Sequence, residues 1–181
     1  MVRRIVCCAV VIVALEVLLG GRISAMTDVP LDGFIDKARV DWVIQNTKPG
    51  DRLVINSIGG DLYHATRLSD HVRNNKIYTH VNSTGVAHSA AALVYSAGVK
   101  RTAGANAQFM IHPGVDAATG QRRDDATAYF LNRYVGFGVK GGPELLKVLT
   151  GDWVMDYDAA RKTNLISEDM PPWLPQIGPL D

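Results

Sequence analysis

The sequence predicts a single α/β domain in which βαβ units build a mostly parallel sheet. From Leu31 to Gly98, segments typical of strands alternate with segments typical of helices. This alternation favours right-handed crossovers that join parallel strands. The chain has 181 residues, which is the size of one domain, and it contains neither an internal repeat nor a linker long enough to separate two domains.

The elements of the first half follow from residue spacing and turn residues. An apolar segment over 31–35 is expected as a strand that ends in a turn at Asp32 and Gly33. Apolar residues recur at helical spacing over 37–46 and over 61–74, which predicts two helices. The other elements expected here are a turn over 48–51, a buried strand over 52–57 and a strand over 76–82.

The second half begins with a loop over 83–88 that leads into a small-residue helix over 90–97, which Gly98 ends. A later helix over 125–139 has apolar and aromatic residues on more than one face, which is typical of a packing or partner surface. The other elements expected are short strands over 101–103 and 107–112, a loop over 113–120, helical turns over 144–149, a helix that is capped by Asp156 or Asp158 and runs to Lys162, and an extended proline-rich tail.

Composition excludes several classes of function. Lys and Arg number 19 and Asp and Glu 18, with no basic stripe of the kind that binds nucleic acid. The only cysteines, Cys7 and Cys8, are adjacent in an N-terminal apolar segment, so we expect no disulfide framework and no Cys/His metal site. We therefore expect no nucleic-acid partner, no metal and no cofactor.

The N-terminal residues have the pattern of a targeting segment. Arg3 and Arg4 precede an apolar run over 5–19, which Glu16 interrupts and small residues follow. The run is short for a membrane span. We expect residues 1–25 to be a cleaved export signal or, alternatively, an N-terminal membrane anchor.

This segment also predicts where the protein acts. We expect the folded domain over 26–170 to be periplasmic or secreted, or else associated with a membrane through the N-terminus. A proline-rich tail over 171–181 follows it. Removal of the signal would leave no cysteine, which suits an oxidising compartment.

Two stretches are candidates for an acyl-transfer site. An apolar strand breaks at Gly59 and Gly60, where glycine permits a close approach and a positive φ. Ser89 opens an Ala-rich helix, so its hydroxyl is expected at the positive end of that helix. A hydroxyl beside outward-pointing amides is the arrangement of a nucleophile and an oxyanion hole. Read alone, each stretch also fits a plain turn or a helix cap.

A candidate base and a candidate acid follow. His112 ends an apolar strand, at the edge where α/β sheets place their sites, whereas the side chain of His88 would diverge from its neighbour Ser89. Asp152 precedes Trp-Val-Met, so we expect its carboxylate to enter an apolar pocket, as suits an acid that holds a histidine tautomer. The alternative interpretations are a histidine bonded to backbone and a turn or cap aspartate.

These residues carry a resemblance to the Clp protease proteolytic subunit, in the wider ClpP/crotonase superfamily, and in particular to small exported Clp-like proteins. The resemblance runs from about Leu31 to Ser167. The segment over 54–60 is similar to the family's Ile-Asn-Ser-Pro-Gly-Gly signature, with Ile58 in place of Pro. Met-Ile-His, ending at His112, is similar to the family's motif around its general base. Asp152 lies ahead of an Ala-rich helix and a strand expected over 165–166, as the family's acid does.

The resemblance implies a ClpP/crotonase-type fold and a serine endopeptidase. Its substrates would be peptides or unfolded protein segments, and because this superfamily generally oligomerises, we expect a homo-oligomer. In the implied mechanism, Ser89 attacks the scissile carbonyl, His112 carries the proton to the leaving amine, Asp152 orients His112, and the amides of Gly60 and Ala90 hold the oxyanion.

The sequence also departs from the family's pattern. Ala90 and Ala91 stand where the family has Met-Gly, and His88 stands where it has a small residue. The segment between His112 and Asp152, which in the family forms the handle joining two rings, is shorter here and puts the double ring in question. Export would separate the protein from the cytoplasmic ATPase, so we expect no such partner.

Three other functions stay open. A catalytically inactive Clp-like binding or scaffold protein would agree with the substitutions around Ser89. A crotonase-type acyl-CoA enzyme would share the fold and the oxyanion hole, but the short chain and the export signal count against it. A peptidase with a Ser/Lys dyad would use Lys100 or Lys140 as its base, but the sequence around His112 fits a triad better.

Overall fold

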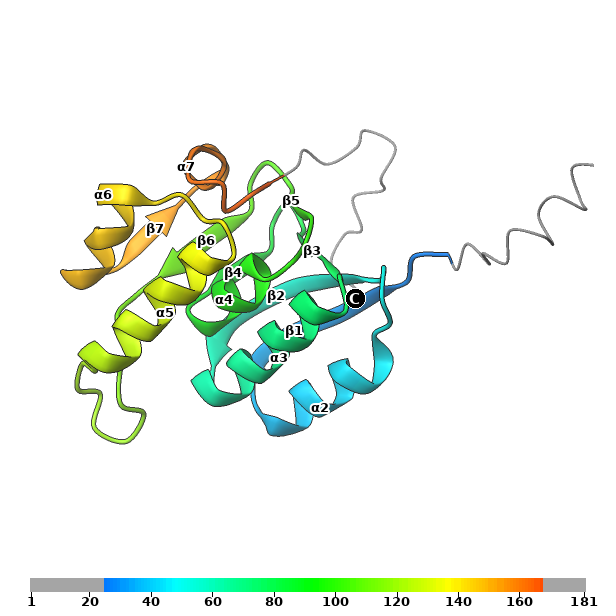
Figure 1. Cartoon of the computed structure of the whole chain (residues 1–181), viewed down its shortest axis with the longest axis horizontal. Coiled ribbons are helices and arrows are strands. Elements are labelled where there is room, and N and C mark those ends of the chain that lie inside the picture. The colour runs from blue at the N-terminus through cyan, green and yellow to red at the C-terminus, as the bar shows by residue number, and fades with distance from the viewer. Residues whose placement is uncertain (1–24, 168–181) are drawn as a thin grey trace, which may run out of the picture.

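Strands and helices alternate along the computed structural model, which describes residues 25–167 (Figure 1). The expected tail over 171–181 and the expected targeting segment, except Ala25, lie outside the described residues. In chain order the elements are β1 (Asp28–Ile35), α2 (Lys37–Asn46), β2 (Arg52–Gly60), α3 (Leu62–Asn74), β3 (Tyr78–Val81), β4 (Val86–His88), α4 (Ala90–Ser96), β5 (Arg101–Ala103), β6 (Gln108–Ile111), α5 (Asp124–Gly136), α6 (Gly142–Leu145), the 3-10 helix η1 (Leu146–Leu149), β7 (Trp153–Met155) and α7 (Tyr157–Lys162).

A mostly parallel sheet organises the described chain, as predicted. Its strand order is β5-β3-β2-β4-β6-β7, and β1 also pairs with β2. One edge of β2 pairs with β1, while the other pairs first with β3 over 52–54 and then with β4 at Ser57. The pairing of β6 with β7 is antiparallel, and the other pairings are parallel. The sheet therefore forks at β2, and the branch β2-β4-β6-β7 carries the candidate site.

Helices α2 to α5 lie on the viewer's side of the sheet in Figure 1, and the hydrophobic core fills the space between. Helix α4 is buried along its whole length, because it packs between the sheet, α3 and α5. This position accounts for its run of alanines, since larger side chains would not fit. In the described part of the chain, no helix has both the length and the apolar character needed to cross a membrane.

Aspartates begin several of the helices. Asp61 accepts a hydrogen bond from the His64 N–H at 2.9 Å and caps α3. Of the two candidates for the cap of α7, Asp156 is the one that acts, because it accepts from the Ala159 N–H at 2.8 Å. These caps satisfy N–H groups that have no partner inside the helix.

Two expected strand ends are wrong. The strand expected over 52–57 continues as β2 through Gly60, because β1 pairs with it up to that residue. Strand β1 does not end at Asp32 and Gly33 but passes them with a shift of register. Gly33 has a φ of 74°, so the turn signal marks an irregularity inside the strand.

Two further expectations also need correction. The loop expected over 83–88 contains β4, a strand of three residues held between β2 and β6, which is too short for sequence periodicity to reveal. Residues 165–166, expected as a strand, form a turn instead. The N–H groups of Leu165 and Ile166 both donate to the Ala160 carbonyl, at 2.9 and 3.1 Å, and so close the end of α7.

Candidate active site

Ser89 lies on a sharp turn between β4 and α4. Its φ of 54° and ψ of −124° form a backbone conformation that non-glycine residues rarely adopt, and such strain persists only where the surroundings enforce it. Its N–H donates to the Met110 carbonyl of β6 at 2.7 Å. The hydroxyl makes no capping hydrogen bond, so helix capping does not explain this serine. A strained serine on a strand-to-helix turn is the arrangement that exposes a nucleophile in α/β hydrolases.

The glycine pair allows close contacts on both sides of β2. A Cβ atom on Gly59, whose φ is 97°, would lie 2.8 Å from the Ser89 Cβ and 3.0 Å from the Ala90 nitrogen. A Cβ atom on Gly60 would lie 2.3 Å from the carbonyl oxygen of Ile35. Gly59 therefore lets β2 touch the Ser89 turn, and Gly60 lets it touch β1.

One of the amides expected to form the oxyanion hole, that of Ala90, lies beside this turn. The backbone of Gly59, the neighbour of Gly60, approaches it, because a Cβ atom on Gly59 would lie 3.0 Å from the Ala90 nitrogen. Ala90 is the first residue of α4, so its N–H has no acceptor within the helix. Ala90 thus has a backbone donor next to Ser89, and no side chain is needed for that role.

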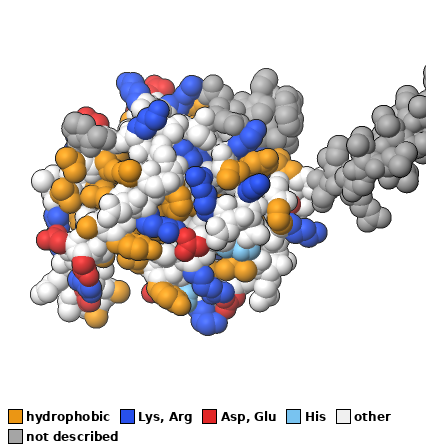
Figure 2. Space-filling model, in the orientation of Figure 1, with side chains coloured by type: hydrophobic (Ala, Val, Ile, Leu, Met, Phe, Trp, Pro, Cys, Tyr) orange, Lys and Arg blue, Asp and Glu red, His pale blue; other side chains and the backbone are white. Residues whose placement is uncertain are grey.

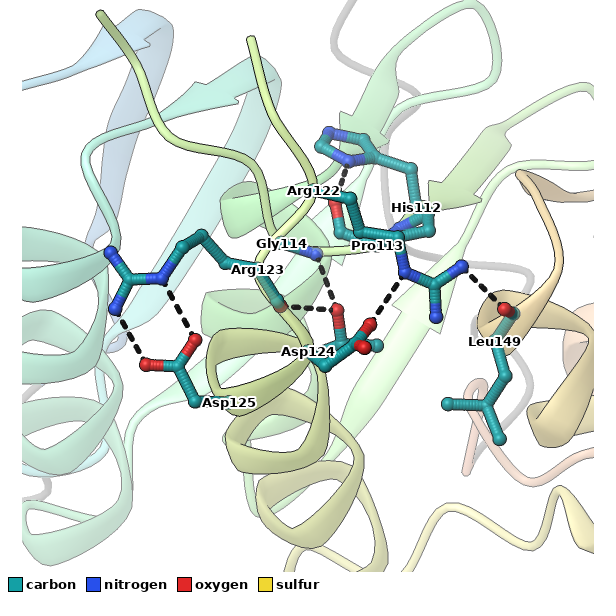
Figure 3. Close-up of polar contacts among 9 residues, drawn as sticks. His112, Pro113, Gly114, Arg122, Arg123, Asp124, Asp125 and Leu149 are labelled. Atoms are coloured by element: carbon teal, nitrogen blue, oxygen red, sulfur yellow. Dashed lines mark hydrogen bonds and ion pairs between the residues drawn. The ribbon is translucent and has the colours of Figure 1, made fainter. Parts of the chain in front are cut away.

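His112 is half-buried and follows directly after β6. Its Nδ1 lies 2.6 Å from the carbonyl oxygen of Pro113, as the dashed line in Figure 3 shows. A carbonyl can only accept, so Nδ1 carries a proton, and in the neutral imidazole Nε2 then keeps its lone pair. This is the tautomer with which a histidine can take a proton from a serine hydroxyl.

His112 and Asp152 lie at the same end of one strand pair. Strand β7 runs antiparallel to β6, and Ile111 pairs with Trp153. His112 follows Ile111 and Asp152 precedes Trp153, so each residue adjoins the last paired position of its strand.

The surroundings of Asp152 differ from those expected. Its side chain is exposed, so the expectation of an apolar pocket is wrong. The reason is the alternation along β7: Trp153 and Met155 point into the core, while Asp152 and Val154 point to the open face. Between these described residues, no hydrogen bond joins His112 to Ser89 or to Asp152, and the Pro113 carbonyl holds Nδ1 instead.

Two other groups shape the surroundings of Ser89. Tyr134 of α5 is buried, and its hydroxyl lies 3.5 Å from the Ser89 carbonyl oxygen. Burial raises the pKa of Tyr134, so the phenol stays neutral. Desolvation lowers the pKa of His88, which disfavours a positive charge beside the nucleophile. Within residues 25–167, no group of three or more His, Cys, Asp or Glu residues is arranged so that it could bind a metal ion.

Of the five expected site residues, Ser89 and Ala90 lie at the turn between β4 and α4, Gly60 ends β2, His112 follows β6 and Asp152 precedes β7. Sequence reasoning missed the Pro113 carbonyl and the Tyr134 hydroxyl. A backbone carbonyl leaves no signal in residue type, and Tyr134 is one aromatic residue among several in α5. The packing of Gly59 against Ser89 could have been predicted from the sequence, because the glycine pair indicates a close approach of the backbone to another group.

Comparison with known proteins agrees with this geometry. Residues 43–129, which include Ser89 and His112 but not Asp152, match the family model described as Clp protease. No curated protein matches the chain in sequence. The fold is similar to that in the crystal structure of the ClpP protease catalytic domain from Plasmodium falciparum, with a TM-score of 0.63 and 19% identity. That match covers 83% of this chain and 88% of the other.

The structural match concerns the fold, and the family match concerns the sequence around Ser89 and His112. At 19% identity the structural match shows the fold alone, while the family match covers the strands and helices that carry Ser89 and His112. Both agree with the forked, mostly parallel sheet. Residues 43–129 are therefore similar to the Clp protease family, and the described chain forms a single α/β domain with a ClpP-like fold.

Proposed function

We propose that this protein is a serine peptidase in which Ser89 is the nucleophile, His112 the general base and Asp152 the acid that orients it. One observation carries the proposal. Strands β4 and β6 pair in parallel up to His88 and Met110, so Ser89 and His112 both follow this strand pair. Asp152 immediately precedes β7, which pairs antiparallel with β6, and this shared strand end supports the proposal. The strained backbone of Ser89 supports it, because such strain clusters at active sites.

In the proposed reaction, the Ser89 oxygen attacks the scissile carbonyl carbon. Nε2 of His112 takes the hydroxyl proton and then gives it to the leaving amine, and water repeats the sequence on the acyl-enzyme. The negative charge on the carbonyl oxygen is held by the amides of Gly60 and Ala90. Loss of one such donor typically removes roughly 2.7–4 kcal/mol of transition-state stabilisation.

The resting contact of His112 must change during this reaction. Nδ1–H donates to the neutral Pro113 carbonyl, while Asp152 immediately precedes β7, the strand that pairs with β6. When His112 takes a proton it becomes a cation, and a hydrogen bond to a carboxylate is then about twice as strong as one to a neutral acceptor. We therefore propose that Nδ1–H moves from Pro113 to Asp152 as the reaction begins.

We further propose that the protein acts outside the cytoplasm, on peptides or unfolded segments, as a homo-oligomer without a cytoplasmic ATPase. The pattern of the N-terminal residues supports export. Hydrophobic side chains gather over α5 and the helical segment that follows it in Figure 2, and Val135 of α5 and Leu146 of η1 are 60% and 55% exposed. Contact with a second copy would cover these residues. Recovery of the full chain in the cytoplasm after cell fractionation would contradict the export proposal.

One observation favours a second candidate, a catalytically inactive binding or scaffold protein. The hydrogen bond from His112 to Pro113 occupies the nitrogen that a working triad presents to the aspartate. If that bond is permanent, Ser89 has no oriented base.

Fluorophosphonate labelling of the assembled protein separates the two candidates. We expect labelling on Ser89, none in Ser89→Ala, and a rate lower by roughly 10²–10⁴-fold in His112→Ala, which is the usual contribution of a general base. Ser83→Ala, in the loop before β4, is the matched serine control and should label like the native protein. Asp152→Asn should label more slowly than Asp158→Asn, which changes an exposed aspartate on α7. Folded, assembled protein that is not labelled would refute the peptidase proposal.

A further inference from the structure

The chain forms a tight hairpin over 114–123 immediately after His112 and Pro113. The Arg123 N–H donates to the Gly114 carbonyl at 2.7 Å, and Val115 and Arg122 form an isolated antiparallel bridge. The base of the hairpin is tied to α5, because Thr127 accepts from the Gly114 N–H at 2.9 Å and donates to the Arg123 carbonyl at 2.8 Å. Its position is therefore set by the same strand end that carries His112.

Arg122 connects this hairpin to the segment that leads into Asp152. Its Nε donates to Asp124 at 2.7 Å, and its Nη1 donates to the Leu149 carbonyl at 2.5 Å (Figure 3). Leu149 ends η1, three residues before Asp152. Carbonyls at the end of a helical turn lack partners within it and favour a positive charge. The guanidinium thus joins the chain after His112 to the chain before Asp152.

Within residues 25–167, neither a hydrogen bond nor an ion pair fixes the Asp152 side chain. It is exposed, and no hydrogen bond joins it to another residue in the described part of the chain. Its position depends on the backbone on either side. On one side, β7 pairs with β6, and on the other side the Leu149 carbonyl is bound by Arg122. The N–H groups of Thr150 and Gly151 also donate to the Lys147 carbonyl, at 2.9 and 3.1 Å, which ties the segment to η1. Release of the Leu149 carbonyl would remove the contact that ties it to the hairpin after His112.

We propose that Arg122 is a positioning residue, which holds the segment over 149–152 so that Asp152 can accept the Nδ1–H of His112. This inference rests on the proposed peptidase function. Arg122 does not touch the reacting atoms, and its effect passes through Leu149 and Asp152. The hydrogen bond from Nδ1 to Pro113 makes this positioning matter, because the carboxylate has to compete with a carbonyl already in place.

Arg123 is a matched control. It is the neighbour of Arg122 and is also exposed, and each of the two arginines binds the aspartate two residues ahead, Asp124 or Asp125. Figure 3 shows the difference: the guanidinium of Arg123 binds Asp125 alone, while that of Arg122 also reaches Leu149. Arg122→Gln and Arg123→Gln therefore remove the same charge and the same kind of local pair, but only the first releases the Leu149 carbonyl.

The test compares kcat, KM and the pH profile of kcat/KM for an unstructured fluorogenic peptide. We expect Arg122→Gln to lower kcat by about 10- to 100-fold, the range in which an error of position of about 1 Å acts, with KM little changed. We also expect its acidic limb to move to lower pH, because an imidazolium without a positioned carboxylate is less stable. Arg122→Lys keeps a donor and should restore part of the rate, and Arg123→Gln should match the native protein.

Two results would overturn the inference. One is equal kcat and equal pH profiles in Arg122→Gln and Arg123→Gln. The other is a lower unfolding temperature in Arg122→Gln with an unchanged acidic limb, which indicates a purely structural contact. If the native protein neither labels nor hydrolyses, the proposed function and this inference fail together, whereas an active native protein with an unaffected Arg122→Gln variant refutes the inference alone.

Discussion

Gly59→Ala tests whether the contact between β2 and the Ser89 turn holds the candidate site together. At Gly59 an added Cβ would lie 2.8 Å from both the His88 carbonyl oxygen and the Ser89 Cβ. Neither atom is the end of a flexible side chain, so the turn itself must move. We expect the substitution to lower both the free energy of unfolding and the rate of labelling at Ser89.

The size of the effect follows from two separate penalties. A side chain at a φ of 97° is strained by roughly 1–2 kcal/mol. Forcing one extra methyl group into a packed site typically destabilises by about 1–3 kcal/mol. The free energy of unfolding should therefore fall by about 2–5 kcal/mol in Gly59→Ala. In Gly120→Ala, the φ is 67° and the Cβ would meet nothing within 4 Å, so only the first penalty applies.

Urea unfolding of the two variants beside the native protein isolates the contact. The difference between Gly59→Ala and Gly120→Ala should be about 1–3 kcal/mol, and only Gly59→Ala should label more slowly with a fluorophosphonate. Equal unfolding free energies in the two variants, together with native labelling in both, would refute the reasoning. That result would mean that the turn relaxes freely around the new methyl group.

Two further predictions concern buried polar groups. Arg101 is 3% exposed and donates to carbonyls at the ends of α4 and α5 and to those of Asn164 and Leu165. Each buried acceptor left unpaired costs about 1–3 kcal/mol. Arg101→Met should therefore lower the free energy of unfolding, measured in urea, by more than about 3 kcal/mol. Burial and the nearby Arg52 lower the pKa of His80 to about 4, so the unfolded chain binds the extra proton below its ordinary pKa of 6.5. The stability that neutral His80 supplies should be complete above pH 6.5 and should decline as the pH falls toward 4, and His80→Gln should flatten this part of the curve of unfolding free energy against pH.

Much of the fold could be predicted because its signals are local. Helix α2 follows the apolar spacing over 37–46, and α3 begins at the capping residue Asp61 as that pattern indicates. The alternation of strands and helices was enough to predict a mostly parallel sheet. The short strands were not predictable in this way, since β4 has three residues and owes its conformation to the two strands beside it.

Some residues of the candidate site could likewise be predicted from local sequence, and others could not. Ser89 and the glycine pair stand out in sequence because a turn, a helix start and a positive φ each demand particular residue types. The partner of His112 does not, because a backbone carbonyl such as that of Pro113 is present at every residue and only the local path of the chain selects one.

By itself, the sequence determined the class of fold, the positions of its longer helices and the residues able to perform acyl-transfer chemistry, because these depend on spacing and on the properties of single side chains. The tertiary structure alone decided which strand ends come together. The antiparallel register of β7 on β6 brings the residue before β7, Asp152, to the strand end that His112 follows, and the Asp152 carboxylate is exposed there. Register between strands that are far apart in the chain depends on how the whole sheet packs, and no short stretch of sequence contains that information.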